Sequence, residues 1–121
     1  MGLKECYLDI GGNYEDVVGR LYSEKLVRKF VMKFLNDPSY ELLESSLKAE
    51  NYEEAFRASH TLKGICQNLS FTRLQQSSSA LTEALRSGFS PEVPELMQKV
   101  TADYQQTAAA IRKLQVEEGA N

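Results

Sequence analysis

The sequence predicts an all-α protein: an up-down four-helix bundle with a short helical cap at its N-terminus. Apolar residues recur at three- and four-residue spacing along most of the chain, which is the period of amphipathic helices. No segment shows a sustained period of two, and Gly11-Gly12 is the one strong turn dipeptide. With 121 residues, 42% of them hydrophobic, the chain can bury one core. We therefore expect a single domain over residues 1–121.

Two short helices are expected to form the cap, over residues 1–22. They run from Leu3 to Ile10 and from Tyr14 to Leu21, on either side of the break at residues 11–13. Their apolar and aromatic side chains are expected to cover the bundle core, although a docking surface beside the bundle is an alternative. These side chains are Tyr7, Leu8, Ile10 and Tyr14.

The bundle itself is expected over residues 23–116. Ser23 is a favourable N-cap for its first helical segment. Pro38 interrupts that segment and suits a first helical position after an Asp37 cap, so either a kink or a break fits. The helix is expected to resume over residues 40–50.

The other three helices are expected over residues 52–70, 71–87 and 91–116. Asn51, with Glu54 three positions later, predicts the start of the first of these. Gly88 is a plausible C-cap for the second, and Pro91 opens the third. The polar tail at residues 117–121 is expected to be frayed.

Charge and cysteine content exclude several functions. The formal net charge is −3 with a pI near 5.2, so the chain lacks the polycationic character that nucleic acids or anionic lipids require. Its first residues contain acids and lack a long apolar run, so they fit neither a secretory signal nor a membrane span. Cys6 and Cys66 have no metal-ligand spacing and suggest a reducing compartment. We expect a cytoplasmic monomer that binds neither nucleic acid, membrane nor metal.

His60 is the only histidine of the chain, and it lies within the predicted helix 52–70. At about 100° per residue, it shares one stripe with Lys63, Gly64 and Gln67. The opposite stripe is apolar and must face the core; it contains Ala55, Ser59, Leu62, Cys66 and Leu69. The imidazole should therefore be accessible to a partner.

A single exposed histidine on a helix is most often an ordinary surface residue, but Gly64 argues against that interpretation here. Glycine in an exposed helix costs about 1 kcal/mol relative to alanine, so its presence suggests that something approaches the backbone beside the imidazole. Lys63 has the charge to receive an anion. Because a neutral imidazole is a good nucleophile, phosphoryl transfer fits this group best.

Residues 60–64 read HTLKG, which resembles the H-x-x-K-G core of histidine-containing phosphotransfer (HPt) domains. The flanking residues 55–59, 68–69 and 71–74 and the helical layout over roughly residues 10 to 115 also look like this family. The resemblance implies that His60 is phosphorylated, through Nε2, that Lys63 supports the phosphoryl oxygens and that Gly64 gives them space. This sequence differs from the family's pattern at two positions. Ser70 stands where the family often has glycine, and Thr82 stands at about the position where some members orient the imidazole with a longer glutamine side chain.

Four residues are candidates for auxiliary roles at this site: Gln67, Thr82, Arg57 and Phe56. For Gln67 the alternative is an ordinary surface glutamine. Cys66 points away from His60 on the same helix, so neither a metal site nor a thiol–imidazole pair is expected.

By its resemblance the chain is expected to be a phosphocarrier of a two-component phosphorelay. Its partners would be response-regulator receiver domains and a hybrid or sensor histidine kinase. No cofactor is expected on this chain, and Mg²⁺ is expected on the partner receiver. The chain has no glycine-rich phosphate loop or kinase signature, so it is not expected to be an enzyme by itself. The alternative is a non-catalytic helical adaptor that binds a signalling partner without phosphorylation of His60.

Overall fold

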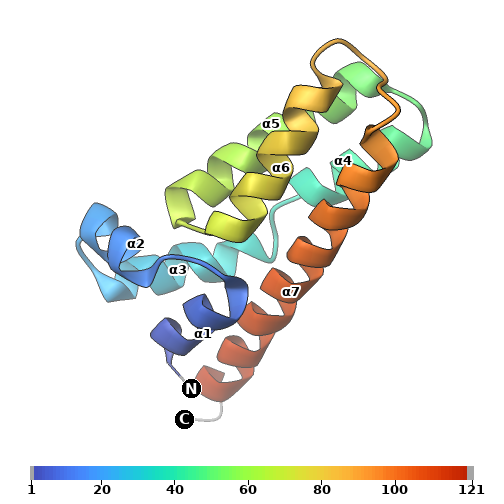
Figure 1. The fold of residues 1–121 in the computed structure, drawn as a ribbon. Helices are drawn as coiled ribbons and strands as arrows, with labels where there is room; N and C mark the ends of the chain where they lie inside the picture. The colour runs from blue at the N-terminus through green and yellow to red at the C-terminus, as the bar shows by residue number, and fades with distance from the viewer. Residues whose placement is uncertain (1, 120–121) are drawn as a thin grey trace.

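The fold is all-α, as the sequence predicts. The computed structural model describes residues 2–119, which contain helices and no strand (Figure 1). The helices are α1 (Leu3–Ile10), α2 (Tyr14–Leu21), α3 (Glu24–Phe34), α4 (Ser39–Lys48), α5 (Tyr52–Leu69), α6 (Thr72–Leu85) and α7 (Val93–Gly119).

The bundle is built around α5. Helix α4 packs along one side of α5 and α6 along the other, while α7 packs against α6 (Figure 1). Helix α1 lies beside the C-terminal half of α7 (Figure 1). The predicted bundle with an N-terminal helical cap is therefore confirmed.

Helix α1 covers the core through one buried tyrosine. The Tyr7 side chain is 1% exposed, and its hydroxyl donates a 2.7 Å hydrogen bond to the Leu69 carbonyl at the end of α5. Its ring centroid is 5.5 Å from that of Phe71. Ile10 is buried beside it, whereas Leu8 is exposed to solvent. The capping role is confirmed for Tyr7 and Ile10 and is wrong for Leu8.

The interruption at Pro38 is a break between two helices. Helix α3 ends at Phe34, and α4 begins at Ser39, so Pro38 precedes the first helical residue instead of occupying that position. Proline cannot donate to a preceding turn, and its ring clashes with that turn, so the helix cannot continue through it. The predicted Asp37 cap is wrong by one residue: Pro38 is the N-cap, and Asp37 precedes it, with its Oδ1 accepting a 2.9 Å hydrogen bond from the Ser39 amide.

The predicted N-caps Ser23 and Asn51 are confirmed, whereas several helix ends differ from prediction. The Ser23 hydroxyl accepts from the Leu26 amide at 3.2 Å, and the Asn51 side chain accepts from the Glu54 amide at 3.2 Å. Helix α6 ends at Leu85, two residues earlier than predicted, and its C-cap is Arg86 and not Gly88. Helix α4 ends two residues early, at Lys48, and α7 begins two residues late, at Val93.

The expected fraying of the C-terminal tail is wrong for residues 117–119, and positions 120–121 lie outside the described residues. Helix α7 continues to Gly119. Its last turn is held at Glu118, whose Oε1 lies 2.6 Å from Nε of Arg28 on α3. This ion pair links the end of α7 to α3.

Candidate functional site

His60 lies in the middle of α5 and faces solvent. The apolar stripe predicted for the same helix is buried, and each of its members is at most 5% exposed: Ala55, Ser59, Leu62, Cys66 and Leu69. Gln67 is exposed, while Lys63 and Gly64 are half-buried. The predicted division of α5 into a core face and an open face is therefore confirmed.

Gly64 has no structural reason to be glycine within residues 2–119. A Cβ built on it would meet no heavy atom within 4 Å outside its own helix, and its backbone is helical with no positive φ. Neither packing nor backbone conformation excludes a side chain there. The free space next to His60 is open to a group that comes from outside the chain.

Phe56 is the auxiliary candidate that the structure brings to the imidazole. Its ring centroid is 6.1 Å from that of His60, one turn along the helix. Arg57 instead turns toward its own helix, where its guanidinium pairs with Glu53 and, at 3.3 Å, with Glu54. The Glu53 carboxylate raises the pKa of Arg57.

The auxiliary role expected for Thr82 is wrong, because its side chain does not face the exposed imidazole. Its side chain is fully buried between α5 and α6. The hydroxyl donates to the Ser78 carbonyl at 2.7 Å and lies 2.7 Å from the Ser59 hydroxyl. Thr82 therefore belongs to the polar part of the core behind the site.

The sequence interpretation missed two residues near the site: Glu83 on α6 and Arg86 at the C-cap of that helix. The Arg86 guanidinium is 2.7 Å from the Glu83 carboxylate, and its Cζ lies 5.3 Å from the centre of the Phe56 ring. This hydrogen bond and the charge of Arg86 lower the pKa of Glu83, with smaller contributions from Lys63 and His60. In the sequence, nothing distinguishes this pair from an ordinary surface pair at i and i+3.

The two thiols are buried and free. Burial raises the pKa of Cys6 to about 11 and raises that of Cys66 further. Such thiols are poor nucleophiles, in keeping with a packing role. Over residues 2–119, no group of three or more His, Cys, Asp or Glu side chains could hold a metal ion. None of the described helices is both long and apolar enough to cross a membrane.

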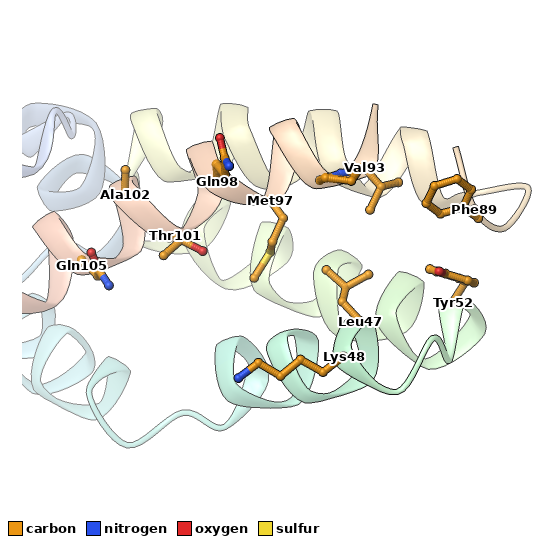
Figure 2. Close-up of a pocket in the computed structure, with 11 residues that line it drawn as sticks. Leu47, Lys48, Tyr52, Phe89, Val93, Met97, Gln98, Thr101, Ala102 and Gln105 are labelled. Atoms are coloured by element: carbon orange, nitrogen blue, oxygen red, sulfur yellow. The ribbon is translucent and has the colours of Figure 1, made fainter. Parts of the chain in front are cut away.

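A groove of about 540 Å³ lies between α4 and α7, away from His60 (Figure 2). Its apolar end is formed by Tyr52 and Phe89, whose rings are 5.4 Å apart. Lys48 and Gln105 lie toward the other end. The exposed stripe of α5 contributes nothing to this groove. His60 is thus a group on an open helix face rather than one in a cleft.

The family model described as Hpt domain matches residues 36–110, which is more than half of the chain and includes His60, Lys63 and Gly64. The chain therefore belongs to the Hpt family, whose members are phosphotransfer intermediates of phosphorelays. The comparisons with curated proteins and with solved structures gave no match.

Proposed function

We propose that this chain is a phosphocarrier that accepts a phosphoryl group on His60 from a receiver-domain aspartate and passes it to another receiver aspartate. The observation that supports this most directly is the exposed position of His60 on α5, with unfilled space at Gly64. Both residues lie within the stretch that the Hpt family matches. An open face of this kind can be covered by a partner that brings the phosphoryl group with it.

In the proposed transfer, the lone pair of His60 Nε2 attacks the phosphorus of the partner's aspartyl phosphate. A nitrogen–phosphorus bond forms, the bond to the aspartate oxygen breaks, and its electron pair returns to the carboxylate. The proton on Nδ1 stays in place, so the loaded ring is an imidazolium. In the second transfer, a receiver carboxylate attacks the phosphorus and the nitrogen recovers its lone pair.

The residues around His60 would act on the phosphoryl group by charge and by space. Lys63, one turn on, would partly neutralise the oxygens of the group, and Gly64 would leave room for them. The partner receiver would supply Mg²⁺ and most of the catalytic groups. The contribution of this chain would then be a nucleophile held at a fixed position on a rigid helix.

The partners proposed are response-regulator receiver domains and a hybrid or sensor histidine kinase, met in the cytoplasm by a monomer of this chain. The phosphoryl group has to come from such a partner, since the sequence has no kinase signature. The adaptor alternative differs in one respect: it predicts binding to a partner with no phosphoryl group on His60.

The test is incubation with a phosphorylated receiver, followed by analysis of the label on this chain. Phosphohistidine is expected, stable in base and labile in acid, and His60→Gln should abolish it. Because the chain has a single histidine, any phosphohistidine on it reports His60. Binding of the receiver without label would favour the adaptor, and equal labelling of His60→Gln would overturn the site.

A further inference from the structure

Glu83 and His60 lie on the same face of the α5–α6 pair. The two helices run antiparallel, and the hydroxyls of Ser59 and Thr82 meet between them at 2.7 Å. From one residue to the next, the direction in which the side chain leaves a helix rotates by about 100° around the helix axis. In an antiparallel pair, these two rotations lead to the same side. His60 follows Ser59 and Glu83 follows Thr82, so both emerge on one surface.

A second contact, one turn away, confirms this register. Phe56 precedes His60 by one turn of α5, and Arg86, the C-cap of α6, follows Glu83 by three residues. The Arg86 Cζ lies 5.3 Å from the centre of the Phe56 ring, whose centroid is 6.1 Å from that of the imidazole. The Glu83–Arg86 pair is therefore held beside the phosphoacceptor by a cation–π contact.

The Glu83–Arg86 ion pair is exposed to solvent and can rearrange when a new charge appears nearby. The side chains of Arg86 and Glu83 are 56% and 60% exposed, so water solvates both, and the ion pair is weak enough to rearrange. Lys63 and His60 are among the groups that lower the pKa of Glu83. Because the Glu83 carboxylate lies this near to His60, it would repel an anionic group bound to the imidazole.

We propose that the Glu83–Arg86 pair tunes the phosphoryl-transfer potential of His60. Glu83 repels the phosphoryl group once it is on the imidazole, and Arg86 attracts it. The Glu83 charge thus keeps phospho-His60 a ready donor, and Arg86 limits that effect. This inference rests on the proposed phosphocarrier function and assigns to the site an electrostatic control from the neighbouring helix.

The size of the effect follows from Coulomb's law. One exposed charge acting across a helix surface in a water-like dielectric changes an equilibrium constant by about three-fold. Glu83→Gln keeps the shape of the side chain and removes the repulsion, so it should favour phospho-His60 by about that factor. Arg86→Gln should disfavour it by a similar factor. Salt should weaken both effects, because exposed charges are screened.

The first measurement needs no receiver. Phosphoramidate transfers its phosphoryl group to the imidazole and releases ammonia, so mixtures of phosphoramidate and ammonium set a loading equilibrium that mass spectrometry can read. The expected order of loading is Glu83→Gln above the parent and Arg86→Gln below it. Loading of Arg86→Lys should be close to that of the parent, since this variant keeps the positive charge. Glu41→Gln is the matched control: Glu41 is exposed on α4, on the other side of α5.

The second measurement repeats the comparison at equilibrium with a phosphorylated receiver. The same order is expected there. Loading by phosphoramidate that is equal in all variants, or that moves in one direction for both Glu83→Gln and Arg86→Gln, would overturn the inference. Failure of every receiver to exchange phosphate with the parent would instead overturn the proposed function, whatever the order of chemical loading.

Discussion

Ser70 ends α5 in a left-handed conformation, with φ 55° and ψ 38°, that glycine adopts at less cost. Its hydroxyl donates a 2.6 Å hydrogen bond to Oδ2 of Asp16 on α2, and its carbonyl accepts from the Asn13 amide at 2.9 Å. The residue is therefore strained in its backbone and bonded through its side chain. Replacement by glycine and by alanine separates these two contributions.

The two replacements have different expected costs. Ser70→Ala keeps the left-handed backbone and loses the hydrogen bond to a carboxylate, which contributes about 1–2 kcal/mol when the carboxylate is half exposed. Ser70→Gly loses the same hydrogen bond but removes a backbone penalty of about 1–2 kcal/mol. The free energy of unfolding of the glycine variant should therefore match that of the parent to within about 1 kcal/mol. The alanine variant should be the least stable of the three proteins.

Urea unfolding followed by far-ultraviolet circular dichroism gives the free energy of unfolding for each protein. An alanine variant as stable as the parent, or more stable than the glycine variant, would refute the reasoning. Ser70 lies ten residues beyond His60, so phosphoryl transfer from a receiver should be unchanged in both variants. A loss of transfer in a folded Ser70→Gly protein would show that this helix end takes part in docking.

Three further predictions concern the open face of α5. Lys63→Ala should slow transfer or shorten the lifetime of phospho-His60 with the helix content unchanged, as measured by label decay and circular dichroism; unchanged kinetics would remove Lys63 from the mechanism. Gly64→Ala should raise the free energy of unfolding by about 1 kcal/mol, because its Cβ meets nothing in the described part of the chain. Gly64→Leu should retain helix content yet lose transfer, and normal transfer would dismiss the close approach of a phosphoryl group.

Features that depend on a few neighbouring residues were predictable from the sequence. Ser23 and Asn51 cap their helices as predicted, because an N-cap needs only a side-chain acceptor before a helical segment. The two faces of α5 were predictable as well, since helical periodicity alone separates His60 from Leu62.

The α6 side of the site was not predictable in the same way. Which α6 side chains face His60 depends on the rotation of α6 against α5, and no local pattern gives that rotation. Thr82 was chosen because the resemblance to the family places it near the position of an imidazole-orienting glutamine, and in the structure it is buried beside Ser59. Glu83, its immediate neighbour, emerges on the open face instead.

The packing of α1 has a consequence for any attempt to transplant this module. The family match covers residues 36–110, yet the core continues past both of those limits. Tyr7 lies before them and Leu114 after them, and both are at most 1% exposed. A graft limited to the matched stretch would leave the α5 end without its hydrogen-bond donor and strip the last turns from α7. The segment that a sequence comparison recognises is therefore shorter than the segment that a designer has to move.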